Sequence, residues 1–189
     1  MNNPEFVEID NKKYKINTDY RIALKCDEVA RDTTIGDYER SLAIIYLLYG
    51  DAGIMDKKNY AELLRLATKF LSCNQEEINE HEEIDMDFSQ DIGFIKASFK
   101  SDYGIILDKE NMHWWDFYMY LNGLTENCVL NRVRELRTYD TSTVKDDKER
   151  AKIQKAQKRV ALKKKKVDIL SEKQRKSVST FYELTGIER

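Results

Sequence analysis

A scarcity of helix-breaking residues constrains the fold of this chain more than any other feature. Its 189 residues include one proline, Pro4, and only seven glycines. Both residue types destabilise helix interiors, so their rarity favours long helical runs. Hydrophobic residues reach 41%, enough to bury a core, and charged residues reach 35%, against ~25% in ordinary globular chains. Such an excess of charge usually coats exposed helices, and the sequence therefore predicts a mainly α protein.

The charges are distributed unevenly along the chain. Residues 1–144 hold 17 Lys/Arg against 27 Asp/Glu, a net charge of −10, whereas residues 145–189 hold 15 against 7, a net charge of +8. One domain of ~100–150 residues with an appendage fits this length. We therefore expect an acidic helical body over residues 1–140 and a basic, partly mobile helical tail over residues 141–189. The two parts either attract each other or meet different partners.

The spacing of apolar residues predicts the elements of the body. Alternation over residues 5–16 predicts a small β-hairpin with its turn at Asn11-Lys12, which must lie against helices to persist. Helical stripes follow over about 19–30, 37–49, 57–71, 88–103, 112–124 and 125–139. The predicted fold is a compact helical bundle of about six helices, with a small N-terminal β-hairpin and a C-terminal basic helix.

Capping residues predict where several helices begin and end. Thr18 offers a hydroxyl to the first helix, and the Gly50-Asp51-Ala52-Gly53 turn is expected to end the second. Asp87 and Gln90 can form a reciprocal capping pair at the fourth helix. The acidic stretch 74–87 that precedes it has few apolar anchors, so we expect a solvated loop or short helix there.

No pattern of residues predicts a catalytic, cofactor-binding or metal-binding site. The two histidines, His81 and His113, have no HExxH-like spacing, and the glycines do not cluster into a phosphate-binding loop. His81 lies among acidic residues, but consecutive carboxylates are usually exposed to solvent rather than bound to a metal ion. His113 is expected to border an aromatic core. The three cysteines form no CxxC pair, as expected of reduced thiols. We expect a non-enzymatic protein that needs no cofactor.

The longest apolar run is too short to cross a membrane. It extends from Leu42 to Tyr49, whereas a spanning helix needs ~20 apolar residues. The N-terminus also lacks the basic and apolar segments of a secretory leader. A soluble protein of the cytosol is the expectation.

The densest aromatic cluster lies in residues 114–121. Aromatics at helical spacing usually belong to a core, but rings here cover the full circumference of a helix. A small body is not expected to hide them all, and the surplus would make a docking face. The candidate partner-binding residues, which would edge an apolar groove for a partner helix, are Trp114, Trp115, Tyr118 and Leu121.

The basic tail supplies a second set of candidate partner-binding residues. Residues 145–166 hold eleven Lys/Arg, three acids and a thin apolar stripe. The candidates are Lys152, Lys155, Arg159 and Lys163. These cations can pair with the phosphates of nucleic acid, which leaves a nucleic-acid-binding regulatory protein that uses the basic C-terminal helix as the alternative function. However, this segment lacks aromatics for base stacking and the body is acidic, so an acidic protein surface or a long coiled partner fits at least as well.

Four segments of the chain resemble a family of phage tail proteins. In order, they read YKINTDYRIALKCDEV, YGIILDKENMHWWDFYMYLNGL, VRELRTYDT and KDDKERAKIQKAQKRVALKK. The family occurs in siphoviruses and prophages of Gram-positive hosts, is encoded just before the tape-measure gene, and is regarded as tail assembly chaperones. The resemblance covers roughly residues 5–165, and the tryptophan block with the following basic stretch is its most specific part.

The resemblance implies a non-catalytic helper of virion assembly. Such a chaperone would coat the helical tape-measure protein in the host cytoplasm and leave as tail tube subunits arrive, so it would be absent from the mature virion. Its partners would be the tape-measure protein and, second, the major tail tube protein. A homo-oligomer is left open. The resemblance carries over no catalytic or ligand-binding residue.

Overall fold

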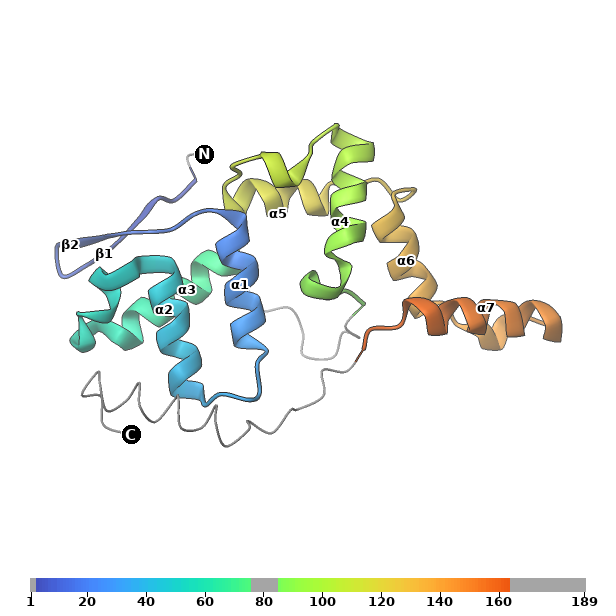
Figure 1. The fold of residues 1–189 in the computed structure, drawn as a ribbon, viewed down its shortest axis with the longest axis horizontal. Helices are drawn as coiled ribbons and strands as arrows, with labels where there is room; N and C mark the ends of the chain where they lie inside the picture. Colours follow the sequence, from blue (N-terminus) through green and yellow to red (C-terminus); the bar gives the residue numbers. More distant parts are fainter. Residues whose placement is uncertain (1–2, 76–84, 164–189) are drawn as a thin grey trace.

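The computed structural model describes residues 3–75 and 85–163. This part of the chain forms one two-stranded hairpin and seven α-helices (Figure 1). In order, the elements are β1 (Phe6–Ile9), β2 (Lys12–Lys15), α1 (Tyr20–Ala30), α2 (Asp37–Ile54), α3 (Tyr60–Leu71), α4 (Phe88–Tyr103), α5 (Trp114–Asn122), α6 (Val129–Thr138) and α7 (Asp147–Val160). The predicted mainly α fold with an N-terminal hairpin is confirmed. His81, most of the acidic stretch and the tail from residue 164 lie outside the described residues.

The hairpin turn lies one residue earlier than predicted. Asp10 and Asn11 adopt positive φ angles of 50° and 63°, and Ile9 pairs with Lys12. Short polar side chains tolerate this left-handed conformation, which two-residue hairpin turns require. The sheet persists because β2 lies against α2, with the Tyr14 ring 1% exposed in the core and its hydroxyl donating to Asp56.

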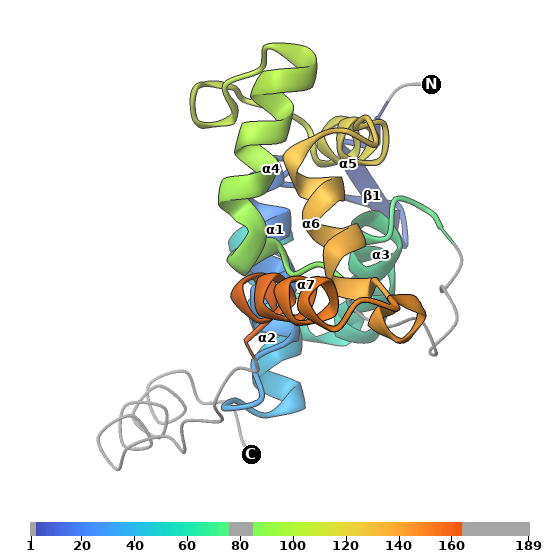
Figure 2. The same cartoon turned by 90° about the vertical axis from the view of Figure 1, so that its right-hand side faces the viewer.

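Helix α1 joins the two halves of the bundle. It contacts α2 on one side and α4 and α5 on the other, as the views in Figures 1 and 2 also show. At the second contact, the Phe117 ring of α5 stacks on Tyr20 of α1 at 4.9 Å and on Phe99 of α4 at 5.2 Å between centroids. One core therefore extends through both halves.

Gly50 bends α2 without ending it, contrary to the prediction. Its φ of 61° and ψ of −153° interrupt the helix, which then continues to Ile54. This backbone conformation is essentially restricted to glycine. Just before the kink, the Leu48 carbonyl accepts a hydrogen bond of 2.8 Å from the Asn17 amide in the β2–α1 connection. The bend thereby fastens the hairpin connection to α2.

One predicted cap is replaced by a neighbouring residue, and one capping pair has a different reciprocal partner. Asp19, rather than Thr18, caps α1 by accepting from the Arg21 amide. At α4, the Asp87 side chain accepts from the Gln90 amide as predicted, but the Asp87 amide donates to the carboxylate of Asp91 and not to Gln90. Aspartate caps at least as well as threonine, which accounts for the first difference.

Helix α7 packs against α6 through a narrow contact. Ile153, Ala156, Gln157 and Val160 are half-buried, and no residue of α7 is fully buried. Figure 2 shows α7 crossing the C-terminal end of α6. Most of the thin apolar stripe predicted for the basic segment therefore faces α6. The charged side chains of α7 face outward.

Candidate interaction surfaces

The two tryptophans at the start of α5 complete the C-terminal end of α3. The Trp114 indole donates to the Leu71 carbonyl and the Trp115 indole to the Phe70 carbonyl, both at 3.0 Å. The last carbonyls of a helix have no partner within it, so these bonds satisfy groups that would otherwise need water. The indoles therefore have a structural role in joining α5 to α3.

His113 caps α5 and binds the N-terminal segment. Its Nδ1 accepts from the Trp115 amide at 3.0 Å, which leaves the proton on Nε2, 3.1 Å from the Pro4 carbonyl. Both ring nitrogens are therefore occupied. The ring also packs edge-on against Phe70, at the border of the aromatic core.

The predicted aromatic groove is not formed by its four residues, because two of them lie in the core. Trp114 is 4% exposed and Leu121 7% exposed, so a partner helix cannot reach them. The reason is tertiary: one face of the short helix α5 packs against α1 and α4. Trp115 and Tyr118 are half-buried, and Met119 beside them is exposed. These three residues form the α5 face.

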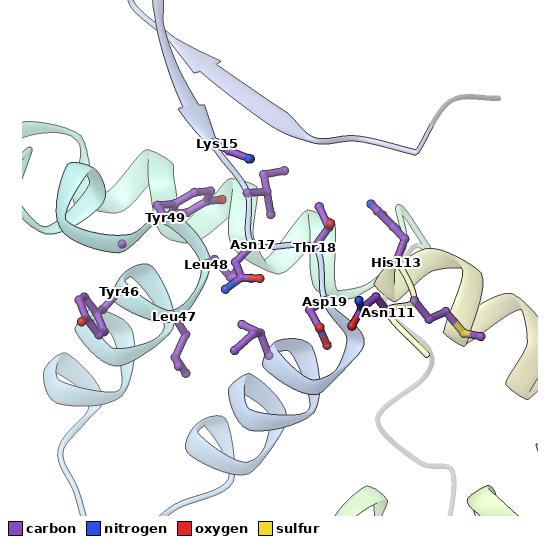
Figure 3. A pocket seen from close by; sticks show the side chains of 14 residues that line it. Lys15, Asn17, Thr18, Asp19, Tyr46, Leu47, Leu48, Tyr49, Asn111 and His113 are labelled. Atoms are coloured by element: carbon purple, nitrogen blue, oxygen red, sulfur yellow. The ribbon is translucent and has the colours of Figure 1, made fainter. Parts of the chain in front are cut away.

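A groove that the sequence did not reveal lies between α1, α2 and the segment before α5. It has a volume of about 790 Å³ and is lined by the hairpin connection, by Tyr46 and Leu47 of α2, and by Asn111 and Met112. In Figure 3, Tyr46 lies on one side and Asp19, Asn111 and His113 on the other. The only sequence signal for it was Gly50, whose kink brings the hairpin connection against α2.

An ion pair or burial holds three titratable groups of the body in their ordinary charge state at neutral pH. Arg21 donates to Asp19 through two nitrogens, at 2.8 and 2.6 Å, and this hydrogen bonding lowers the pKa of the Asp19 carboxyl. Burial raises the pKa of the Cys26 and Cys73 thiols to about 12. These thiols therefore stay protonated and weakly nucleophilic at neutral pH.

Neither a metal-binding cluster nor a membrane-spanning helix occurs in the part of the chain that the structure describes. No group of three or more His, Cys, Asp or Glu side chains is placed to hold a metal ion among residues 3–75 and 85–163. None of the helices in these same ranges combines the length and apolar character needed to cross a bilayer.

The basic residues of α7 form an exposed stripe. Lys148, Lys152, Lys155 and Arg159 are spaced by four, three and four residues, so they lie on one side of the helix. All four are exposed, and none forms an ion pair with another described residue. We call these four residues the basic stripe. Three of the four predicted tail residues belong to it.

Lys163, the fourth predicted tail residue, lies beyond the end of α7. Its backbone amide donates to the Gln90 side chain at 2.8 Å, and its carbonyl accepts from the same amide group at 3.1 Å. Its side chain is exposed. This bidentate contact holds the segment after α7 beside the start of α4.

Arg137 of α6 holds the basic stripe in position and was not identified from the sequence. Its guanidinium binds both oxygens of Asp91 on α4 at 2.7 Å, and its Nε donates to the Val160 carbonyl at the end of α7 at 2.6 Å. The two side chains are only 9% and 1% exposed. Arg137 comes four residues after Val133 and so lies on the same inner face of α6. This spacing was the signal in the sequence that could have identified it.

The structure does not bring the predicted aromatic residues of α5 and the predicted basic residues of the tail together in one site. The α5 face and the basic stripe belong to helices that lie toward opposite ends of α6 in both views (Figures 1 and 2). Helix α7 contacts α6, whereas α5 contacts α1 and α4. A partner that used both surfaces would therefore have to extend along the molecule.

Comparison with known proteins gives one match. The model of a protein family described as Bacteriophage Gp15 protein matches residues 1–162, a range that includes all seven described helices. No curated protein and no solved structure matches the chain.

Proposed function

Because the chain belongs to the Bacteriophage Gp15 protein family, we propose that it is a tail assembly chaperone that binds the tape-measure protein without catalysis. It would act in the cytoplasm of a Gram-positive host, deliver the tape-measure protein to tail tube subunits, and be absent from the finished virion. Family membership supports a phage structural or assembly role. The finer assignment rests on the chain's resemblance to tail chaperones and on its exposed surfaces.

The observation that carries this proposal is the basic stripe without partners in the described structure. A tape-measure protein is a long helix whose exposed apolar stripes aggregate, so a helper must cover it weakly and repeatedly. Exposed ion pairs are individually weak, which allows release when tube subunits arrive. The α5 face supplies apolar contact, and the basic stripe supplies charge.

Capture of a tape-measure fragment by the immobilised full chain tests the proposal. We expect capture by the wild type and reduced capture by a Trp115→Ala, Tyr118→Ala variant. Because Trp115 also bonds Phe70, a Met119→Glu variant tests the same face without disturbing the core. The matched control is Tyr38→Ala with Tyr46→Ala, two exposed aromatic residues on α2.

Each result of this experiment has a definite meaning. Failure of the wild type to retain the fragment above the bare matrix contradicts the chaperone role. Equal retention by the wild type and both α5-face variants removes that face from the mechanism. Loss of retention by the control pair as well would indicate non-specific adhesion through any exposed ring.

A nucleic-acid-binding regulator is the second candidate function, and the basic stripe is the observation that favours it. Binding of this kind would involve unrelated duplexes and would weaken steeply as salt is raised, because counterions are released from the phosphates. A gel shift at low salt that detects no complex with duplex DNA removes this candidate.

A further inference from the structure

An apolar hollow lies where α6 meets α7. It has a volume of about 250 Å³ and is lined by Arg132, Glu135, Leu136, Tyr139 and Ile153. Tyr139 is 44% exposed, so its ring stands at the rim. Leu136 and Ile153 are half-buried beneath it. A single large apolar side chain of a partner would fit in such a hollow.

The basic stripe runs past this hollow, because Lys152, its second residue, directly precedes the lining residue Ile153. It runs for about 16 Å along α7, at 1.5 Å per residue. Like charges three or four residues apart repel each other and weaken a helix. Asp147 and Glu149 flank Lys148 at the start of the stripe, and residues 150–163 contain no acid to relieve the repulsion farther along it. The lining also holds the exposed Arg132 and Glu135, whose opposite charges add no net charge to the stripe.

We propose that this α6–α7 edge docks an acidic amphipathic helix of a partner protein. Charge complementarity requires negative groups opposite the four cations of the stripe. The spacing of four, three and four residues repeats every ~3.5 residues, which is the period at which two helices keep contact. The partner helix would place one apolar side chain in the hollow and carboxylates along the stripe.

The same features make a nucleic acid a poorer fit. A phosphate backbone offers nothing to fill a hollow built on Leu136 and Ile153, and α7 carries no aromatic side chain on which bases could stack. A protein helix uses both the apolar and the charged parts. The inference rests on the proposed function only in taking the partner to be a protein.

Fluorescence anisotropy with defined probes tests the docking site on the full chain. The first probe is a labelled synthetic helix of about three heptads with a leucine stripe flanked by glutamates. The second replaces those glutamates by glutamine, and the third is a DNA duplex of unrelated sequence. We expect the glutamate helix to bind more tightly than either other probe, at physiological salt.

Variants locate the binding on the molecule. Reversing three charges of the stripe (Lys152→Glu, Lys155→Glu and Arg159→Glu) should weaken binding of the glutamate helix by about tenfold or more. The matched control reverses three exposed body lysines that form no ion pair in the described structure (Lys13→Glu, Lys25→Glu and Lys57→Glu) and should retain binding. Tyr139→Ala should weaken binding several-fold and should leave the circular dichroism spectrum unchanged.

Several outcomes would overturn the inference. Equal loss in the stripe and body variants would mean that only net charge matters, and unchanged binding by Tyr139→Ala would mean that the hollow has no part. DNA binding as tightly as the glutamate helix would identify a nucleic-acid surface instead. Sedimentation that shows a dimer, abolished by reversing the stripe, would identify the acidic body of a second copy as the occupant.

The tape-measure capture experiment separates this inference from the proposed function. Retention of the tape-measure fragment by both the wild type and the stripe variant leaves the chaperone role standing and shows that the tape-measure protein does not dock at the α6–α7 edge; failure of the glutamate helix to bind then contradicts the docking site itself. No retention by the wild type, together with stripe-dependent binding of the glutamate helix, contradicts the role and supports the docking site.

Discussion

Arg137 connects three segments in the C-terminal half of the bundle. Its guanidinium donates to the carboxylate of Asp91, to the Asp85 carbonyl and to the Val160 carbonyl, and so connects α6 with the start of α4 and the end of α7. Asp91 also accepts from the Asp87 amide. A buried ion pair contributes little net stability, but removing one partner leaves a buried charge without compensation.

We predict that Arg137→Ala lowers the free energy of unfolding by about 3–5 kcal/mol, because Asp91 then stays buried without a counter-charge. Urea denaturation followed by circular dichroism measures this. Combining Arg137→Met with Asp91→Leu should recover much of the loss, since no charge remains in the interior.

The control for this prediction is an exposed pair on α3. Arg65 bonds Glu62 at 2.6 Å, but both side chains face solvent, at 60% and 42% exposure. Arg65→Ala should therefore leave the urea midpoint almost unchanged. A loss as large as that of Arg137→Ala would show that the buried position has no special importance.

At the scale of an element, α2 illustrates how one glycine shapes a helix. The helix is kinked at Gly50. Just before the kink, Tyr46 and Leu47 line the groove, and the Leu48 carbonyl binds the hairpin connection. Nothing lies within 4 Å of the position that a Cβ would take at Gly50. The requirement for glycine is therefore conformational rather than steric.

We predict that Gly50→Ala destabilises the protein by about 1–3 kcal/mol, because φ near 61° is unfavourable for a residue with a Cβ. Thermal unfolding measures this. The same substitution at Gly93, in the exposed middle of α4 and also without neighbours, should stabilise by about 0.5–1 kcal/mol. If both changes had the same sign, the argument from the kink would be wrong.

At the scale of the whole molecule, one core supports opposite surface charges. Buried residues from the hairpin and from α1 to α6 form a single cluster, whereas α7 contributes no buried residue. Its basic side chains therefore face solvent next to a body of net negative charge. We expect one cooperative unfolding transition for the body, with the basic stripe free to meet a partner.

This shared core predicts a loss of stability at alkaline pH. Burial raises the pKa of Cys26 from 9.0 to about 12 and also raises the pKa of Tyr49. The folded state thus keeps protons that the unfolded chain releases above pH 9. Stability should be fully present below that pH and should fall as the pH rises further. Urea midpoints measured under reducing conditions from pH ~7 to ~11 check this.

The Cys26→Ala variant is the control for the alkaline prediction. It should be less stable than the wild type at neutral pH, because a small cavity replaces the sulfur. Its midpoint should then decline less steeply above pH 9, since one of the buried acidic groups is gone. Equal slopes for the two proteins would mean that Cys26 does not account for the loss.

Most of the helices and most of the basic stripe were predictable, whereas the burial of the aromatic cluster was not. Periodicity placed α3, α4 and α6 within a few residues, because each exposes a polar face and buries an apolar one. Periodicity could not identify the buried face of α5, because aromatic rings surround this helix. The sequence does not say which of Trp114 and Trp115 faces inward. Only the packing of α1, α3 and α4 around α5 decides that.

The sequence by itself determined the helical class, the hairpin and the separation of acidic from basic segments, because these depend on local propensity and on the order of charges along the chain. The tertiary structure alone decided that Trp114 and Leu121 are core, that Arg137 pairs with Asp91, and that the basic stripe lies beside an apolar hollow. Such contacts join residues far apart in the chain, and their free energy depends on which faces of the helices meet.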